Sequence, residues 1–303
     1  MDNLTHSLIG ALLGQAGLKR KTGLATPTLI IAANLPDIDA ACTVFGTLSL
    51  AMRRGLTHGP IAMLVLPLVL TAGMVVYDRW QAGGGRRPPG RPLVHRGWLL
   101  ALACVGCLSH PLFDWLNSYG IRLLEPFSSR WFYGDALFIV DPWLLALLIA
   151  GIWLSRRREK AQRSDWRHPA FVSLVGIFGY VGLNLMISTW IADRARMSEP
   201  YPQTVVANPV PLTFWRREVL WRGEGSYGSY ITSPWSPRHG ERPPRPIGMD
   251  DPRIHRRLPQ SPEARALLFW SRMPVAEVQG DTVVLGDQRF LGRGFGPFRV
   301  ELD

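Results

Sequence analysis

The sequence predicts a helical membrane domain of about six spans, followed by a small β-rich domain outside the membrane. Three observations support this fold class. Long apolar segments fill the first two thirds of the 303-residue chain, and basic residues gather in alternate loops between them. After residue 192, alternating, aromatic-rich segments replace the long apolar ones. We therefore place the membrane domain at residues 1–192 and the β-rich domain at residues 193–303.

Four apolar segments contain no Asp, Glu, Lys or Arg, namely residues 61–76, 97–109, 143–154 and 169–192. The last has 24 residues. About 20 residues are needed to cross a hydrocarbon core of about 30 Å, so this segment alone is long enough, and the others need their polar flanks. Residues 4–18 and 22–35 have polar interruptions, and they form either the first two spans or half-buried helices. The alternative to a membrane domain is a soluble helical core.

The distribution of basic residues predicts the orientation. Fourteen lie in alternate loops: Lys19, Arg20, Lys21, Arg79, Arg86, Arg87, Arg91, Arg96, Arg156, Arg157, Arg158, Lys160, Arg163 and Arg167. The intervening loops, residues 38–59 and 114–137, hold only Arg53, Arg54, Arg122 and Arg130. Because cytoplasmic loops carry an excess of Lys and Arg, we expect the first set to be cytoplasmic. Six spans then leave residues 193–303 on the outer side.

The net charge of +11 would also fit a protein that binds nucleic acid. Most of the excess, however, lies in the loops that set the orientation, without interleaved aromatic residues. We therefore expect no nucleic-acid partner. Of the three cysteines, Cys42 stands alone, and Cys104 and Cys107, one helical turn apart, are expected to be small buried residues rather than redox or metal-binding groups.

Beyond residue 192, local signals predict strands, a long loop and one helix. Alternating segments at residues 210–221, 226–232, 282–285 and 298–302 predict strands and hairpins. Residues 233–260 contain seven prolines and are predicted to form an extended loop. Ser261 followed by Pro262 predicts the start of a short helix, with Ser as the N-cap and Pro at the first helical position.

Acidic and histidine side chains of the membrane domain lie beside prolines, at Pro36-Asp37, His58-Gly59-Pro60, His110-Pro111 and Asp141-Pro142. Proline starts or ends helices because it lacks an N–H and restricts the preceding residue, so four helix ends are predicted here. In the six-span topology one set of side chains falls on the outer side: His6, Asp37, Asp39, His58, His110, Asp114, Asp135 and Asp141.

Three motifs within that set carry candidate metal ligands. His110 and Asp114 lie four residues apart, which puts an imidazole and a carboxylate on one helical face. Asp37 and Asp39 follow a helix and would point the same way if the chain is extended. His58 adds a second imidazole before the next helix. Each motif alone also fits helix-end solvation or a structural histidine, but their common face predicts a metal site.

Five motifs in fixed order carry a resemblance to a known family: Asp-Asn-Leu-Thr-His at 2–6, Pro-Asp-Ile-Asp at 36–39, Arg-Gly-Leu-Thr-His at 54–58, His-Pro-Leu-Phe-Asp at 110–114 and Phe-Ile-Val-Asp-Pro at 138–142. They resemble the bacterial LexA-regulated, inner-membrane-associated metal-dependent hydrolases, closely over residues 1–145 and in outline beyond. This resemblance implies a multi-pass protein of the bacterial inner membrane. A remote resemblance to the zinc-dependent phospholipase C and single-strand nuclease group implies these ligands: His6, Asp37 or Asp39, His58, His110 and Asp114.

The sequence also departs from those patterns. Arg53 and Gly59 stand where family members commonly have His and Ser. The later His-x-x-x-Glu pair of the remote relatives is absent, which leaves Asp135 and Asp141 as the nearby substitutes. Asp135 could instead be a loop acid, and Asp141 could cap the helix that Pro142 opens. We therefore expect one or two divalent ions, zinc or a similar metal, rather than three.

The resulting expectation is a membrane-bound metal-dependent hydrolase at the outer face of the inner membrane. A bound metal lowers the pKa of water to about 7 and polarises the attacked bond. Asp39 or Asp141 would serve as the general base, and Arg54 would steady a phosphate or an oxyanion. A site at the bilayer surface favours a membrane lipid or a lipid-linked phosphoester or ester as the substrate.

Two other functions fit parts of the pattern. A non-enzymatic assembly or regulatory protein could hold a structural metal in a closed set of ligands. A transporter would carry ionisable residues in mid-membrane. The central spans carry none, and Asn184 is their polar exception, so a transporter is the less favoured alternative. The sequence leaves the oligomeric state open.

Overall fold

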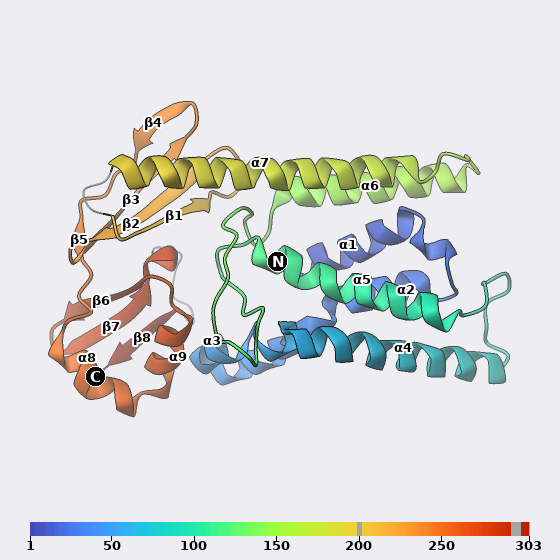
Figure 1. The fold of residues 1–303 in the computed structure, drawn as a ribbon, viewed down its shortest axis with the longest axis horizontal. Helices are drawn as coiled ribbons and strands as arrows, with labels where there is room; N and C mark the ends of the chain where they lie inside the picture. Colours follow the sequence, from blue (N-terminus) through green and yellow to red (C-terminus); the bar gives the residue numbers. More distant parts are fainter. Residues whose placement is uncertain (199–201, 292–297, 303) are drawn as a thin grey trace. The chain divides into compact units, whose positions relative to one another are not determined.

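The computed structural model describes residues 1–198, 202–291 and 298–302 (Figure 1). Its contacts divide the chain into two units, Met1–Ile38 with Arg54–Leu183, and Asp39–Arg53 with Asn184–Asp303. The first unit is helical, and the second contains the antiparallel strands. A mostly helical protein with a β-rich C-terminal region is thus confirmed. The boundary at residue 192 stays a prediction, because helix α7, His168–Ser198, runs through it.

Helices make up most of the first unit: α1 Asn3–Gln15, α2 Ala25–Asn34, α4 Pro60–Gly83, α5 Arg96–Trp115, α6 Pro142–Lys160 and the first part of α7, with 3-10 turns η1 Leu18–Arg20 and η3 Leu56–His58. Within the part of the chain that the structure describes, four helical stretches are long and apolar enough to cross a membrane: Ala25–Met52, Pro60–Gly83, Arg96–Trp115 and His168–Ser198. Six spans are not confirmed, because α1 has only 13 residues and α6 ends in five charged ones.

Two predictions about local geometry are wrong. Helix α5 does not end at His110-Pro111 but continues through Pro111 to Trp115. A proline near the C-terminal end of a helix removes one hydrogen bond without preventing a last turn. The chain after Asn34 is not extended either, since Leu35–Leu48 forms 3-10 turns, called η2. Residues two apart in a 3-10 helix point about 240° apart, so Asp37 and Asp39 do not share a face.

Small residues let the helices of the first unit approach closely. A Cβ added at Gly10 of α1 would lie 2.7 Å from the carbonyl oxygen of Leu29 in α2. A Cβ at Gly106 of α5 would lie 2.5 Å from the Cβ of Ala32, also in α2. Close backbone contact of this kind is common between helices in membranes, where dispersion and packing replace the hydrophobic driving force. Helices α1, α2 and α5 therefore form one tightly packed group.

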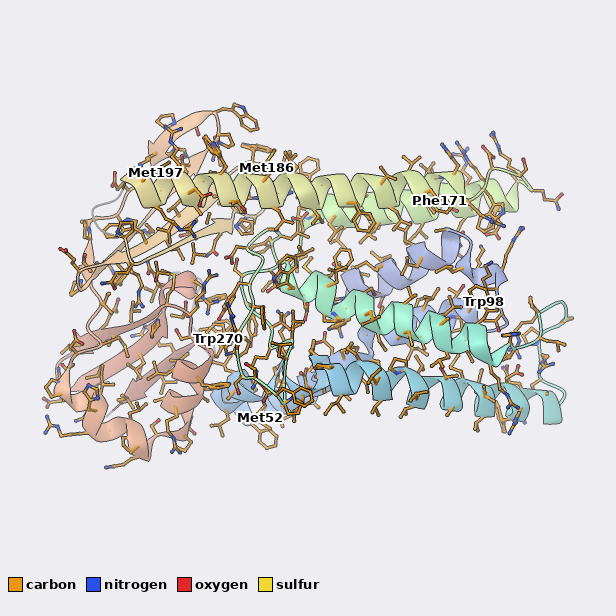
Figure 2. The ribbon with its side chains drawn as sticks, viewed as in Figure 1. Met52, Trp98, Phe171, Met186, Met197 and Trp270 are labelled. Carbon is orange, nitrogen blue, oxygen red and sulfur yellow. The ribbon has the colours of Figure 1, made fainter. Side chains whose placement is uncertain are left out.

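The basic loops of the first unit lie together at one end of these helices (Figure 1). Lys19 forms an ion pair with Glu159 at the end of α6, and its ammonium group lies 4.5 Å from the ring centroid of Trp166. Lys21 lies 4.7 Å from the ring of Trp98, which Figure 2 labels near the start of α5. The start of α1, the end of α2, the start of α4 and the end of α5 lie at the opposite end (Figure 1).

The second unit contains two antiparallel sheets. Strands β1 Thr204–Pro209, β2 Arg217–Gly223, β3 Ser226–Ser233 and β4 Ser236–His239 are paired in that order, and β5 Arg245–Pro246 also pairs with β3. The other sheet has the order β6 Pro274–Gln279, β7 Thr282–Asp287, β8 Arg299–Leu302. The remaining elements are α3 Ser49–Met52, α8 Pro252–Arg257, η4 Leu258–Gln260, α9 Pro262–Trp270 and η5 Gln288–Phe290.

The sequence predicted the central strands of this unit but not its short, exposed ones. The predicted strands at residues 226–232 and 282–285 correspond to β3 and β7, and the N-cap of α9 is confirmed, since Ser261 accepts from the backbone N–H of Ala264. Only residues 217–221 of the strand predicted at 210–221 belong to β2. The loop predicted at 233–260 is wrong in part, because β4, β5 and α8 lie within it. Its strands are short and mostly exposed, so no alternation marks them.

A buried arginine explains the polar exception in the last long helix. The side chain of Arg217 in β2 is fully buried. Its Nη2 donates to the Oδ1 of Asn184 at 2.9 Å and to the carbonyl oxygen of the same residue at 3.0 Å. Its Nε donates to the Oγ of Ser188 at 2.7 Å. Asn184 therefore anchors the first sheet to the end of α7.

Candidate metal centre

Four predicted ligands meet in the first unit: Asp37, His58, His110 and Asp114. One ligand atom from each lies within 4.8 Å of the other three. The Nε2 of His110 lies 3.6 Å from the Oδ1 of Asp37 and 3.5 Å from the Oδ2 of Asp114. The Nε2 of His58 lies 3.9 Å and 3.6 Å from the same two oxygens. Both imidazoles and Asp114 are buried, and Asp37 is partly exposed.

The spacing and chemistry of these atoms fit a divalent cation. Zinc bonds of about 2.0–2.2 Å place the ligand atoms of a tetrahedral site about 3.3–3.6 Å apart. The four His–Asp separations of 3.5–3.9 Å are close to that range, and the other two pairs of ligand atoms lie within 4.8 Å. Among the described residues, no hydrogen bond reaches the buried His110 Nε2 or Asp37 Oδ1. Buried polar atoms without partners are costly, and two carboxylates would balance a 2+ ion.

Helix α5 presents both of its ligands in the required orientation. His110 and Asp114 are one turn apart on the same face, as their spacing predicted. The Nδ1 of His110 lies 2.7 Å from the carbonyl oxygen of Ala33 in α2. Only a protonated Nδ1 can donate to that oxygen, so in the neutral, metal-binding imidazole the Nε2 carries the lone pair and faces the other ligands. The close packing of α5 on α2 thus sets the tautomer of a ligand.

His58 and Asp37 reach the group from the ends of other elements. His58 is the last residue of the 3-10 turn η3, directly before the Gly59-Pro60 start of α4. Its Nδ1 lies 2.9 Å from the Oγ1 of Thr57. Asp37 lies in the first turn of η2, three residues after the end of α2. Proline beside both residues was the sequence signal that marked these ends.

Asp114 is held from a second side by Arg54 and His6. The Nε of Arg54 lies 3.1 Å from the Oδ2 of Asp114, and its Nη2 donates to the Oδ1 at 3.3 Å. The Nε2 of His6 lies 3.3 Å from the same Oδ1, and its ring stacks on His110 with centroids 3.8 Å apart. The amino group of Met1 also contacts Asp114. Arg54 and His6 are therefore neighbours of the four-residue group rather than members of it.

The remaining predicted residues lie outside the four-residue group. Asp39 is buried and belongs to the second unit. Asp135 adopts a left-handed conformation, with φ 49°, in the segment after α5. Asp141 caps α6, because its Oδ1 accepts from the backbone N–H groups of Trp143 at 3.1 Å and Leu144 at 2.9 Å. The hydroxyl of Tyr180 donates to the same carboxylate at 3.0 Å.

Sequence reasoning missed a loop that packs against the ligand-bearing turn. The Nη1 of Arg54 donates to the Oδ1 of Asn117 at 3.1 Å. A Cβ at Gly55 would lie 2.4 Å from the Nη2 of Arg122, and one at Gly59 would lie 1.9 Å from the carbonyl oxygen of Glu125. In this structure the carbonyl of Glu125 leaves no room for a side chain at Gly59. The two glycines flanking Leu-Thr-His were the available signal.

Comparison with known proteins assigns the chain to a family. A family model described as YdjM inner membrane protein matches residues 1–191, a range that contains the whole four-residue group. No match was found among curated proteins or among solved structures. The match agrees with the predicted association with the bacterial inner membrane and with the apolar helices. Because it covers more than half of the 303 residues, the chain belongs to the YdjM inner membrane protein family.

Proposed function

We propose that this protein is a membrane-bound metal-dependent hydrolase that cleaves a phosphoester or ester of a membrane lipid or lipid-linked molecule. The observation that carries the proposal is the buried group of Asp37, His58, His110 and Asp114, whose ligand atoms converge and in part lack other partners. A divalent cation held there, zinc or a similar ion, supplies Lewis-acid chemistry that polarises the attacked bond and activates water.

The surrounding residues have separate tasks in this proposal. Arg54 contacts both oxygens of Asp114 and His6 contacts its Oδ1, and these contacts fix the carboxylate while its Oδ2 faces the ligand group. The general base is Asp39 or Asp141, as the sequence suggested. The carboxylate of Asp141 already accepts from two backbone amides and a tyrosine. Asp39→Asn and Asp141→Asn distinguish the two candidates, because the variant that lacks the base should keep the metal and lose turnover.

The location of the group supports a substrate at the membrane surface. The helix ends that carry the ligands lie opposite the basic loops of the first unit. Since basic loops are typically cytoplasmic, we propose six spans in which the ligand-bearing ends, together with the domain after residue 192, face outward. Substrates reaching the group from the bilayer would be lipids or lipid-linked molecules.

A structural metal in a non-enzymatic assembly or regulatory protein is the second candidate. It is favoured by one observation: four protein ligands form a closed set, and His58, His110 and Asp114 are at most 1% exposed. The side chain of Asp37, at 6%, is the most exposed of the four, so an open position for substrate would lie on its side of the group. Metal-dependent turnover of a substrate would support the hydrolase, and its absence would support the structural metal.

The test combines metal analysis and substrate screening on detergent-purified full-length protein. We expect one or two equivalents of zinc or a similar metal, and metal-dependent cleavage of at least one member of a panel of lipid phosphoesters and esters. Bound metal without turnover on any panel member would favour the structural candidate. Protein that binds no divalent metal at all would refute both.

A further inference from the structure

An apolar groove lies on the helices that carry the metal centre. It has a volume of about 310 Å³ and is formed by α1, α5, α6 and α7. Its lining includes Ile9, Leu108, Leu112, Leu148 and Ile177. Ser109 is the one polar residue among the described lining residues, and its hydroxyl donates to the carbonyl oxygen of Gly106 at 2.7 Å. The groove therefore offers hydrocarbon surface without a free polar group.

The groove begins beside the metal centre. On α1, His6, Ile9 and Leu13 are spaced three and four residues apart and share one face. Ile9 and Leu13 line the groove, whereas His6 lies 3.3 Å from Asp114. Ile9 is therefore about 4.5 Å along the helix axis from His6. The side chains of His6, Ile9 and Leu13 thus form one continuous stripe along α1, from the metal centre to the groove.

Helix α5 also carries residues of both the groove and the metal centre. Val105, Leu108 and Leu112 line the groove from the face of α5 that points away from its ligands, and Ser109 and Phe113, which also line it, directly precede the ligands His110 and Asp114. The stretch from Val105 to Leu112 covers about 10 Å along the axis. Because α5 ends at the metal centre, the groove extends from that centre back along the helix, towards the middle of a candidate span.

We propose that one acyl chain of a phospholipid lies in this groove while its phosphate group lies at the metal centre. This inference rests on the proposed function and specifies its substrate. Leu108, Leu112 and Phe178 are 54%, 50% and 67% exposed, so bilayer hydrocarbon can enter the groove from the side. Bilayer chains are as apolar as leucine, so the groove orients the chain rather than contributing much affinity. The charged ligand group at its end selects the phosphate.

Photolabelling in a bilayer tests the proposal. The full-length, metal-loaded protein is placed in phosphatidylcholine nanodiscs with a phosphatidic acid that carries a diazirine midway along one acyl chain. Mass spectrometry maps the labelled residues. We expect several-fold more labelling of groove residues than of Leu64, which lies on α4 and is 71% exposed. A diacylglycerol with the same diazirine chain, lacking the phosphate, should show a weaker preference for the groove.

Matched variants assign the contributions of chain and phosphate. Leu108→Trp fills the groove and should reduce groove labelling several-fold, whereas Leu64→Trp should leave it unchanged. His110→Ala should lower phosphatidic acid labelling of the groove to the diacylglycerol level. Metal content, measured in every sample, confirms that the tryptophan variants are folded.

The outcomes separate this inference from the proposed function. Equal labelling of the groove and Leu64, or groove labelling unaffected by Leu108→Trp, overturns the groove proposal, although metal-dependent hydrolysis could still be measured. A phosphatidic acid preference that survives His110→Ala overturns the placement of the phosphate. Wild-type protein without bound metal refutes the proposed function, whatever the labelling pattern.

Discussion

Asp114 is the residue on which most contacts of the metal centre depend. Its Oδ2 faces His58 and His110, its Oδ1 faces His6, and the guanidinium of Arg54 contacts both oxygens. Because metal ligands act as a unit, losses from removing them should not add. We predict that His110→Ala, Asp114→Ala and the double variant show similarly low metal occupancy by elemental analysis and similarly abolished turnover.

Cys104→Ala is the control for this prediction, since Cys104 lies in the same helix outside the four-residue group. It should keep wild-type metal content. If His110→Ala and Asp114→Ala both retain full occupancy and activity, the residues do not share a metal.

Arg54 tests whether its guanidinium positions a ligand or contacts the substrate. Two of its nitrogens contact the two oxygens of Asp114, and a third donates to Asn117. A lysine cannot reproduce this fork. We predict that Arg54→Lys weakens metal affinity by about 10- to 100-fold, the usual cost of losing a residue that orients a ligand. Metal titration measures the effect, and excess metal should restore turnover.

The exposed Arg130 provides the matched control, since Arg130→Lys should leave the metal affinity unchanged. The contrary result for Arg54→Lys would be a raised KM with unaltered metal affinity, which would assign Arg54 to the substrate as its sequence position suggested.

Prediction of the site from sequence succeeded where a local rule applied. The four-residue spacing of His110 and Asp114, and the prolines near Asp37 and His58, are local features. The choice between Asp37 and Asp39 depends on the 3-10 turns of η2, and the tautomer of His110 depends on the carbonyl of Ala33, 77 residues away. Tertiary contacts of this kind leave no pattern in the sequence.

At the scale of elements, the packing of α2 against α5 positions the ligands. Gly106 permits it, because a Cβ there would meet the Cβ of Ala32 at 2.5 Å. We predict that Gly106→Ala lowers the stability by about 1–3 kcal/mol through overpacking. It should also lower metal occupancy, since Ala33 beside this contact accepts from His110. Thermal unfolding in detergent and metal analysis measure the two effects.

Gly73→Ala is the matched control, because a Cβ at Gly73 of α4 meets nothing within 4 Å. Alanine also forms helices better than glycine, by up to about 1 kcal/mol, so this variant should be unchanged or more stable. Equal behaviour of the two variants would mean that α2 and α5 are not in close contact.

The second sheet of the β-rich unit contains a buried ion pair that predicts a pH dependence. Burial disfavours ionisation of Asp287, but the charge and hydrogen bonds of Arg289 outweigh it and lower the pKa from 3.8 to about 2. A lowered folded-state pKa stabilises the fold above the unfolded-state pKa, and that stabilisation is lost as the pH falls towards the folded-state pKa.

We therefore predict that Asp287→Asn destabilises the second unit at pH 7 by roughly 2 kcal/mol. The difference from wild type should shrink as the pH falls from about 4 to 2, because the carboxylate then becomes protonated. The difference in unfolding free energy is measured by denaturant unfolding, monitored through the fluorescence of the buried Trp270. A difference that stays constant over this range would show that Asp287 does not carry the pH dependence.

At the scale of the whole molecule, charge placement and composition predicted the arrangement of loops and the β-rich region, whereas helix length did not determine the number of spans. Basic loops gather at one end of the first unit, as their alternation along the chain suggested, and a β-rich region follows the apolar helices. The number of spans was not fixed by sequence, because α1 and α6 combine apolar and polar residues. Asn184 binds Arg217, which removes the polar feature that would have suited a transport path.

Topology is the last prediction, and it depends on whether α6 crosses the bilayer. Its 19 residues are about 28 Å long, but its last five residues are charged. In the proposed topology, single cysteines at Gly84 and Lys160 are cytoplasmic, whereas those at Ser129 and Gln279 are outside. In a cysteine-free background, an impermeant maleimide should label the latter pair in intact cells and the former pair only after permeabilisation. If α6 does not cross, Ser129 and Lys160 will be labelled from the same side and Gln279 from the opposite one. The ligand-bearing ends and the β-rich domain would then face different compartments, and the outer-face assignment would be wrong for one of them.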